Sequence, residues 1–488
     1  MPADIAFSSA TVLAARLRSG KLSALELLDH YIARVEKHDG ALNAVVVRDF
    51  ERARKRAKAA DRALKKGKPW GPLHGLPMTV KESFNVEGLK TTWGNPAFKD
   101  NVANYTSVAI ERLQAAGVVV FGKTNVPLLL QDVQSYNAIY GTTRNPYDTS
   151  RTPGGSSGGG GAAVAAGLSA ADFGSDLAGS IRVPASFCGL YSHKPSFGVV
   201  PTRGHSLTPA LAAPDLSVLG PIARSARDLE PLLHAVAGPL EDDAAGWTLK
   251  LPRSKVERIK DLRIGVLTDV EISPIAHSVR AGMDGLVQWL GSKGAKISTA
   301  TMPIEPQKHQ AMFMRFVRGV TAARMNDGVF QQTLADAAKY AADDLSPPAI
   351  AARGLAQYHR DWCAAHETRM HLRAAWADFF RDHDLLLIPG TPVPAFPFDE
   401  TPVREARKLD IDGRAVPYNA QGFWQGIATV SYLPATVAPI GRTAEGLPIS
   451  VQAIGPYLGD LSTIGFARIV EQEYARFTLP EAFSLSPS

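Results

Sequence analysis

Cysteine is almost absent from this chain, which has only Cys188 and Cys363 among its 488 residues. Two cysteines cannot build a disulfide framework or a cysteine-rich zinc site, and such sparse use fits a reducing compartment. Long apolar runs are also missing, because no stretch reaches the roughly 20 residues that a membrane-spanning helix needs. The N-terminal segment lacks a basic start followed by an apolar core and a small-residue cleavage site. The sequence therefore predicts a cytoplasmic protein with no membrane partner.

An excess of one charge is missing as well. The chain has 53 Lys and Arg against 47 Asp and Glu, a net charge of +6. The densest basic run, Arg52 to Lys68, is interrupted by Asp61, and its alanines recur at helical spacing. Because no aromatic side chains are interleaved for base stacking, this run indicates a helix with one solvated face rather than a nucleic-acid patch. We expect no nucleic-acid partner, and a monomer or homodimer.

Hydrophobic patterns of two periods alternate along the chain. The first 70 residues have a helical pattern, and Ser23 followed by Glu26 forms a capping box before the apolar positions. Further helix patterns lie at 108–116, 162–166 and 279–290. Strand patterns lie at 76–81, 118–121, 262–267, 385–388 and 449–454. Such alternation predicts an α/β fold with helices flanking a central sheet.

The pattern suggests one domain over residues 1–488. We expect N-terminal helices (1–70), a core that carries the chemistry (71–240), a variable cap or insertion (241–436) and a return to the core sheet (437–488). The third segment is less patterned, with a helical stretch at 307–340 and a Pro-rich loop at 389–398. Since the strands before and after it look like parts of one sheet, it is interpreted as an insertion rather than a second enzyme.

Three familiar motifs occur in contexts that argue against them. Gly117 to Thr124 fits the phosphate-binding pattern GxxxxGKT, but its middle residues, VVVF, favour a strand, whose N–H groups point into a sheet. His366 and His371 nearly form HExxH, yet the second histidine comes one residue late, about 100° too far around a helix. Gly155 to Gly159 satisfies GxSxG, but a loop with a proline precedes it instead of the required strand. We therefore expect no metal and no cofactor.

A long segment of small residues, 153–189, holds the serines that can carry chemistry. A linker would continue in Ser, Pro or charge, whereas GGSSGGGG at 154–161 runs into AAVAAG, which is typical of a closely packed helix. Further on, Ser180 follows a tight turn and precedes IRVPA, which is typical of a first helical turn. There, backbone N–H groups and the helix dipole favour a developing oxyanion. A plain N-cap serine is the structural alternative.

Several segments together resemble the signature of the amidase signature family. GGSSGG (154–159) is followed after a short helix by GSDLAGSIRVPASFCG (174–189), and GPLHGLPMTVKESFNVEG (71–88) precedes both. Further matches are GKTN (122–125), GTTRNPYD (141–148), GPIARSARD (220–228) and GLPISVQAIGP (446–456). So many ordered matches make the resemblance specific. It implies a central, mostly parallel mixed β-sheet with α-helices on both faces.

The resemblance also implies a set of catalytic residues. In that family they are a lysine, a serine preceded by a cis peptide bond and a nucleophilic serine, which map by motif position to Lys81, Ser156 and Ser180. The implied oxyanion hole uses the backbone N–H groups of Leu177, Ala178, Gly179 and Ser180. The implied supporting residues are Ser157, Asp176 and Arg182. Ala178 departs from the family's usual glycine, which adds a Cβ but removes no N–H group.

The chemistry of amide cleavage fits these residue types. An amide needs a strong nucleophile, an oxyanion site and a proton for its poor leaving group. Lysine acts as a base only when neutral, which requires lowering its pKa by about 2–3 units through burial and neighbours. Ser156 would then relay a proton from Ser180 to Lys81. We expect an amidase that hydrolyses a C–N bond through a Ser180 acyl-enzyme, with water as the second substrate.

Substrate identity depends on less regular segments. The resemblance places the pocket after GKTN and in the C-terminal half. The candidate side chains there are Leu129, Leu130, Gln131, Phe423, Trp424 and Tyr432. They suggest a small apolar or aromatic amide or anilide, with esters and carbamates also open. Aryl acylamidases, nylon-oligomer hydrolases and carbamate-cleaving urethanases are the members of the family that fit this choice. Core packing explains the three aromatic residues equally well.

Two other functions share this fold. The A subunit of glutamyl-tRNA(Gln) amidotransferase, a glutaminase, works in a complex with tRNA and ATP. The segment QDVQSYNAIY (131–140) departs from the GSSTEN-type segment of that protein. A non-catalytic binding module that kept the fold is the other alternative, and the intact triad argues against it.

Overall fold

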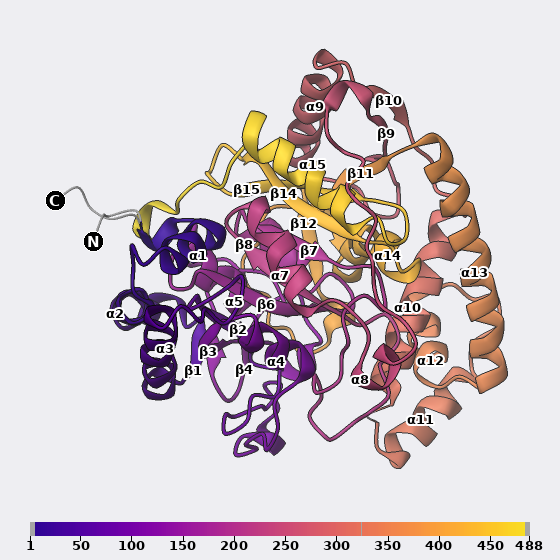
Figure 1. Ribbon diagram of the computed structural model, residues 1–488. Coiled ribbons are helices and arrows are strands. Elements are labelled where there is room, and N and C mark those ends of the chain that lie inside the picture. Colours follow the sequence, from indigo (N-terminus) through magenta and orange to yellow (C-terminus); the bar gives the residue numbers. More distant parts are fainter. Residues whose placement is uncertain (1–4, 324, 484–488) are drawn as a thin grey trace.

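The computed structural model describes residues 5–323 and 325–483. Its centre is a mixed sheet of 11 strands with helices on both faces (Figure 1). In sheet order the strands are β1 (Val45–Arg48), β3 (Val119–Thr124), β2 (Pro77–Lys81), β6 (Ala171–Asp176), β8 (Val218–Ala223), β7 (Tyr191–Lys194), β14 (Ala435–Arg442), β15 (Pro448–Ile454), β11 (Leu385–Pro389), β9 (Arg263–Val266) and β10 (Lys296–Thr299). Two short hairpins lie outside this sheet: β4 (Tyr136–Asn137) with β5 (Gly141–Thr142), and β12 (Lys408–Ile411) with β13 (Arg414–Pro417).

The helices come from every part of the chain. They are α1 (Ala10–Arg18), α2 (Ala24–Leu42), α3 (Phe50–Lys65), α4 (Val108–Ala115), α5 (Gly158–Ala165), α6 (Arg182–Phe187), α7 (Leu229–Val236), α8 (Glu241–Ala244), α9 (His277–Ser292), α10 (Pro306–Ala322), α11 (Asp327–Ala337), α12 (Pro347–Leu355), α13 (His359–Asp382), α14 (Gly422–Val430) and α15 (Asp460–Glu473). No helix of the described residues combines the length and the apolarity needed to cross a membrane.

The N-terminal region confirms the capping box and corrects the all-helical prediction. The Glu26 backbone N–H donates to Ser23 Oγ and the Ser23 backbone N–H to Glu26 Oε2, each at 3.1 Å. However, β1 interrupts the helices and pairs antiparallel with β3. Its residues read VVVR, a β-branched run that favours a strand. The helical pattern on both sides of this short run concealed it.

The mixed sheet is confirmed, but the predicted predominance of parallel strands is wrong. Four strand pairs are parallel, namely β2 with β3, β2 with β6, β9 with β11 and β9 with β10. Six pairs are antiparallel. The central strands cause this, because β14 and β15 are joined by a short turn, and a short turn forces antiparallel pairing.

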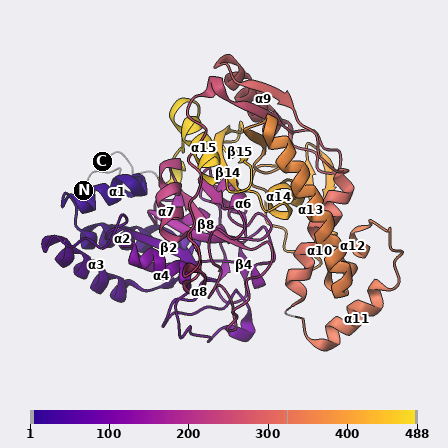
Figure 2. The same cartoon turned by 45° about the vertical axis from the view of Figure 1, so that its right-hand side comes forward.

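Most of the individual strand and helix predictions are confirmed. The five predicted strands are β2, β3, β9, β11 and β15, and VVVF lies in and just before β3, as expected for a strand rather than a phosphate loop. The helical stretch at 307–340 is two helices, α10 and α11. Together with α12 and α13 they form a group at one side of the molecule (Figure 2). The segment 241–436 is not all outside the sheet, since it supplies β9, β10 and β11.

The topology brings the predicted reactive residues to one edge of the sheet. Lys81 is the last residue of β2, and Ser180 follows the end of β6. These two strands are parallel neighbours, with Thr79 opposite Asp172. Because parallel strands end at the same edge, Lys81 and the turn after β6 lie together there. Ser156 reaches the same edge from the loop that leads into α5.

Candidate active site

Lys81 lies completely inside the protein and points at two serine side chains. Its Nζ atom is 2.7 Å from Ser156 Oγ, 2.9 Å from Ser175 Oγ and 3.3 Å from the Ser175 carbonyl oxygen. The exposed fraction of Lys81 is 0% and that of Ser156 is 1%. The sequence-predicted lysine and relay serine are therefore in direct contact. Ser175 was not singled out from the sequence, although it stands in the GSD motif.

The surroundings of Lys81 change its acid–base behaviour. Burial lowers the pKa of Lys81 to about 7, because the charged ammonium group loses its hydration. The negative charges of Asp176 and Asp172 raise the pKa, but by less than burial lowers it. A substantial fraction of the amine is consequently neutral at neutral pH and able to accept a proton.

Ser156 follows a cis peptide bond, as the resemblance implied. The bond joins Gly155 to Ser156. Gly155 also has no room for a side chain, since a Cβ there would lie 2.6 Å from the Asp132 carbonyl oxygen and 2.8 Å from the Gln134 nitrogen. The loop therefore runs directly against residues 132–134, which places that segment beside Ser156.

The glycines after Ser157 are part of a helix rather than a flexible loop. The helix α5 begins at Gly158, earlier than the predicted 162, and all its residues are buried. A Cβ at Gly159 would lie 2.2 Å from the Asn125 nitrogen, and one at Gly160 would lie 2.3 Å from Asp172 Oδ1. Glycine is required here by close packing against the sheet.

Ser180 lies in the turn between β6 and α6 and is partly exposed. The backbone N–H of Ser157 donates to the Ser180 carbonyl oxygen at 3.1 Å, which fixes the turn next to Ser156. In the described residues, no hydrogen bond joins the Ser180 hydroxyl to the Ser156 hydroxyl. The structure thus brings Lys81 and Ser156 into contact and holds Ser180 beside them through the backbone.

The four predicted oxyanion donors differ in their hydrogen bonding. The Gly179 backbone N–H donates to Asp176 Oδ1 at 2.8 Å, so it is engaged in this structure. Among the described residues, the N–H groups of Leu177, Ala178 and Ser180 have no hydrogen-bond partner. Leu177 and Ala178 are only half-buried, so solvent reaches this part of the turn.

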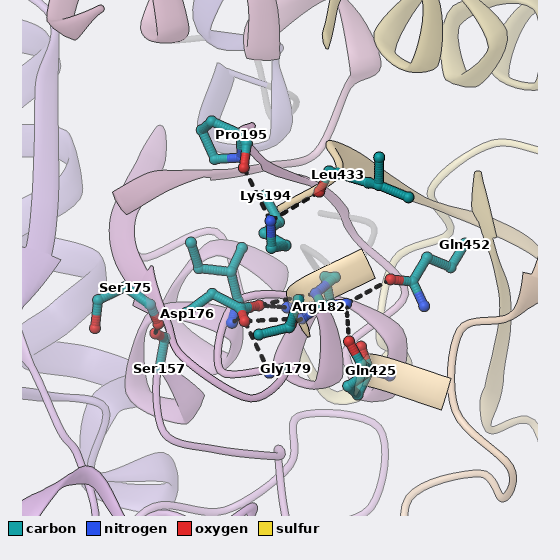
Figure 3. A network of polar contacts seen from close by, with 12 residues as sticks. Ser157, Ser175, Asp176, Gly179, Arg182, Lys194, Pro195, Gln425, Leu433 and Gln452 are labelled. Atoms are coloured by element: carbon teal, nitrogen blue, oxygen red, sulfur yellow. Dashed lines mark hydrogen bonds and ion pairs between the residues drawn. The ribbon is translucent and has the colours of Figure 1, made fainter. Parts of the chain in front are cut away.

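Asp176 and Arg182 form a buried ion pair that holds this turn (Figure 3). Arg182 Nη2 donates to Asp176 Oδ1 at 2.9 Å and Arg182 Nε to Oδ2 at 3.0 Å. Burial would raise the pKa of Asp176, but the Arg182 guanidinium and the Gly179 N–H outweigh it and lower the pKa to about 2. Asp176 is therefore ionised over the whole physiological range.

The same guanidinium reaches the C-terminal part of the chain. Arg182 donates to the Gln425 carbonyl oxygen at 3.0 Å, to Gln452 Oε1 at 2.7 Å and to Thr429 Oγ1 at 2.7 Å (Figure 3). Gln425 also abuts Gly179, where a Cβ would lie 2.7 Å from Gln425 Cγ. These partners were not found from the sequence, because nothing in their local pattern points to a site.

A second buried lysine, Lys194, lies nearby. Burial and then the charge of Arg182 lower the pKa of Lys194 to about 7, and Lys194 Nζ donates to the Leu433 carbonyl oxygen.

The first half of the predicted pocket lies in the segment that precedes residues 132–134. Leu129 and Leu130 are half-buried and Gln131 is exposed, in the segment that leads to residues 132–134 beside Ser156. The Leu129 backbone N–H donates to the Trp93 carbonyl oxygen at 2.7 Å, which holds the segment in place. Leu129 and Leu130 both have positive φ angles, of 52° and 62°.

The aromatic half of the predicted pocket is core packing. Phe423 and Trp424 are 0% exposed. The Phe423 ring meets His309 edge-on at 5.3 Å, and Trp424 Nε1 donates to the Ser273 carbonyl oxygen. Tyr432 is also held, since its hydroxyl donates to Asp215 at 2.5 Å. On α14, it is the next residue, Gln425, that lies against Gly179 in the turn between β6 and α6.

The motif histidines lie away from this site, and the described residues hold no metal-binding cluster. His366 and His371 both stand on α13. Within residues 5–323 and 325–483, no group of three or more His, Cys, Asp or Glu side chains is arranged to hold a metal ion.

Comparison with known proteins agrees with the geometry. A family model described as Amidase matches residues 26–464. The chain belongs to the amidase signature family. It is accordingly a hydrolase-family protein that acts on amide C–N bonds.

Curated relatives of this amidase share about a third of its residues. The A subunit of glutamyl-tRNA(Gln) amidotransferase from Synechococcus sp. (strain CC9605) is 31% identical over 96% of this chain and 96% of its own length. The protein of the same name from Thermus thermophilus is 32% identical over 95% and 96%.

Solved structures of other proteins show the same fold. A chain described in work on a vestigial protein complex and the origins of an s-triazine catabolic enzyme has a TM-score of 0.81, is 30% identical and covers 96% of this chain and all of its own. The 6-aminohexanoate cyclic dimer hydrolase has a TM-score of 0.79 and is 26% identical, covering 98% of this chain and 99% of its own.

Proposed function

We propose that this amidase works as a free-standing enzyme with Ser180 as nucleophile, Ser156 as proton relay and Lys81 as base. The observation that carries the proposal is the 2.7 Å contact between Lys81 Nζ and Ser156 Oγ, two side chains that are almost completely buried. The lowered pKa of Lys81, about 7, supports the same role, because a base must be partly neutral at working pH.

In the proposed mechanism, Ser180 Oγ attacks the amide carbonyl carbon while its proton passes to Ser156 and the Ser156 proton passes to Lys81 Nζ. The oxygen of the tetrahedral intermediate accepts hydrogen bonds from the free N–H groups at Leu177, Ala178 and Ser180. The intermediate collapses as the proton returns through Ser156 to the leaving nitrogen. Water then attacks the acyl-enzyme, with the same groups moving its proton. Rotation of the Ser180 side chain on substrate binding brings the two hydroxyls together, because such contacts often tighten only in the complex.

The proposed substrate is a small amide or anilide with an apolar or aromatic group. Leu129 and Leu130 support this choice, since their segment lies against the loop of Ser156 and neither side chain is fully covered. Phe423, Trp424 and Tyr432 no longer support it, because they pack elsewhere. Esters and carbamates carry the same electrophilic carbonyl and are secondary candidates.

A second candidate is the glutaminase component, the A subunit, of a glutamyl-tRNA(Gln) amidotransferase. The curated relatives favour it, since several that match nearly the whole chain carry that name at 28–32% identity. Such a component works together with partner chains. Two outcomes would therefore favour this candidate over a free-standing amidase: co-purification of partner chains, or glutaminase activity that appears only when partners are added.

The deciding experiment is a substrate screen of the isolated chain. Primary amides, anilides, esters and carbamates are tested beside glutamine, with the Ser180→Ala variant as the matched control. Turnover of anilides or apolar amides by the wild type alone would support the proposal. A fluorophosphonate that labels the wild type but not Ser180→Ala identifies the nucleophile and excludes a non-catalytic binding module. Absence of both turnover and labelling would overturn the proposal.

A further inference from the structure

A second buried carboxyl group, Asp172, lies close to Lys81 and has no part in the mechanism above. Asp172 is in β6, opposite Thr79 of β2 in the parallel register. Thr79 and Lys81 are two residues apart on one strand, so their side chains lie on the same face of the sheet. Asp172 Oδ2 accepts hydrogen bonds from Thr79 Oγ1 at 2.7 Å and from Thr124 Oγ1 at 3.1 Å.

The other oxygen of this carboxyl group is left without a partner. Asp172 is 0% exposed, and its Oδ1 atom makes no hydrogen bond within the described residues. The helix α5 closes the space around it, since a Cβ at Gly160 would lie 2.3 Å from Oδ1. Buried polar atoms are nearly always paired, so an unpaired carboxyl oxygen beside a reactive lysine needs an explanation.

Few charged groups face this pair. Lys81 is the one charged group that acts on Asp172 among the described residues. The residues that the neighbouring elements place next to Asp172 are uncharged: Ile222 on β8, Thr124 on β3 and Gly160 on α5. Lys81 faces Asp172 and also Asp176. The positive charges of Arg182 and Lys194 act on Asp176.

Asp172 and Lys81 have pKa values displaced toward each other. Burial raises the pKa of Asp172 to about 7, against the hydrogen bonds from Thr79 and Thr124 and the charge of Lys81, which lower it. Burial lowers the pKa of Lys81 to about 7. Two interacting groups with similar pKa values titrate as a pair rather than one by one.

We propose that Asp172 is a positioning residue that acts through Lys81, by setting whether the lysine is charged or neutral. An ionised Asp172 stabilises the ammonium form, and a protonated Asp172 leaves the neutral amine favoured. Protonation of Asp172 removes its buried negative charge, which lowers the cost of leaving Oδ1 without a partner. The inference rests on the proposed function, in which neutral Lys81 is the base.

The test compares the pH dependence of Ser180 labelling by a fluorophosphonate in the wild type and in Asp172→Asn. Asparagine keeps the shape of the side chain but carries no charge, so Lys81 becomes neutral at lower pH. The acid limb of the labelling rate, followed from about pH 5 to about pH 9, is expected to move down by about one pH unit. An unchanged limb, or a limb that moves up, would overturn the inference.

Two further variants separate an electrostatic role from a structural one. Thr124→Val removes a hydrogen bond that favours the ionised carboxylate, so the limb is expected to move in the same direction by less. Asp228→Asn alters another buried carboxylate, which accepts hydrogen bonds from Ala10 and Thr11 far from Lys81. It should lower the melting temperature and leave the limb in place. If Asp172→Asn does not fold, the pH profile of Thr124→Val decides whether Asp172 acts on Lys81. An acid limb of the Thr124→Val labelling rate that stays at the wild-type pH refutes that role.

The same measurement tells failure of the inference from failure of the proposed function. If the wild type is labelled on Ser180 and all variants share its pH profile, the mechanism stands and Asp172 is only a structural partner of the two threonines. If the wild type is not labelled at any pH, or Ser180→Ala is labelled equally, the proposed function itself is wrong.

Discussion

The backbone of Ser157 holds the backbone of Ser180, through a 3.1 Å hydrogen bond from the N–H of the first to the carbonyl oxygen of the second. Ser157 is the neighbour of Ser156, the proposed relay, so the proposed relay and nucleophile are carried by loops that are fixed to each other. The Ser175 carbonyl oxygen adds to this connection, since it is 3.3 Å from Lys81 Nζ and accepts from Ser157 Oγ at 3.4 Å. The proposed proton path therefore starts from loops whose backbones are already fixed relative to each other.

Removing the nucleophile or the base should abolish turnover without unfolding the protein. Ser180→Ala and Lys81→Met each take away a group that the mechanism requires, and a loss of roughly four to six orders of magnitude in kcat is expected. Methionine fills the volume of the buried lysine, so the melting temperature should fall little. Turnover by a responsive amide substrate measures the effect. Ser150→Ala, at an exposed serine, is the control that should keep full activity.

Activity should rise as the pH increases through about 7. The proposed base is the neutral amine of Lys81, and its pKa of about 7 means that the fraction of active base grows on the alkaline side of that value. The plot of log(kcat/KM) against pH should therefore show an acid limb with a bend near neutral pH. A limb that bends near pH 10, where an ordinary lysine titrates, would contradict a role for Lys81 as base.

Loss of Arg182 should destabilise the whole protein. Arg182→Met leaves the Asp176 carboxylate buried without its cation, which costs about 3–5 kcal/mol in the free energy of unfolding. Because the folded pKa of Asp176 is about 2, below its ordinary 3.8, the wild-type pair stabilises the fold above about pH 4 and loses this contribution as the pH falls toward 2. Urea denaturation at neutral pH measures the cost.

The control for this prediction is an exposed ion pair. Arg258 contacts Asp261 at 2.6 Å, and both side chains are at least half exposed. Arg258→Met should change the free energy of unfolding by less than about 1 kcal/mol. Equal effects of the two substitutions would show that burial of the Arg182–Asp176 pair does not determine its contribution to the free energy of unfolding.

The neighbouring positions 178 and 179 should differ strongly in how much kcat depends on the presence of a methyl group. Ala178→Gly only removes a Cβ beside the oxyanion donors, so kcat should change by less than about tenfold. Gly179→Ala adds one at a φ of 103°, where it would also lie 2.7 Å from Gln425 Cγ. Displacing the turn misplaces the N–H donors, and a loss of roughly 100-fold or more in kcat is expected. Comparable activity in both variants would contradict the assigned oxyanion turn.

Much of the site was predictable because close packing requires several of the glycines in its GGSSGGGG motif. Gly155, Gly159 and Gly160 each approach another backbone or side chain so closely that a Cβ has no space. Lys81 stands at the end of a recognisable strand pattern, whereas no strand pattern was identified directly before Ser180, so its placement followed only once β2 and β6 were neighbours. The engaged Gly179 N–H could not be foreseen, since it depends on the rotamer of Asp176.

The C-terminal contributions were not predictable, because they depend on how distant elements pack. Trp424 and Gln425 are adjacent in sequence and differ by about 100° around a helix. Trp424 therefore lies in the core, whereas Gln425 lies against Gly179 in the turn that carries Ser180. Which one faces the turn is set by the orientation of α14, and no local pattern encodes it. The antiparallel centre of the sheet was missed for a related reason, since strand spacing alone does not give strand order.

The contacts of Arg182 tie the reactive site to the order in which the chain is made. Protein domains tend to fold from the N-terminus during synthesis, and Lys81, Ser156 and Ser180 all emerge early. Gln452, however, lies 270 residues beyond Arg182, in a strand near the middle of the sheet. Until that strand leaves the ribosome, the guanidinium can bond to Asp176 but lacks Gln452, and the turn that it steadies is only partly supported. We therefore expect a nascent chain to remain inert toward amides, and to acquire its reactivity only in the last stage of its own synthesis.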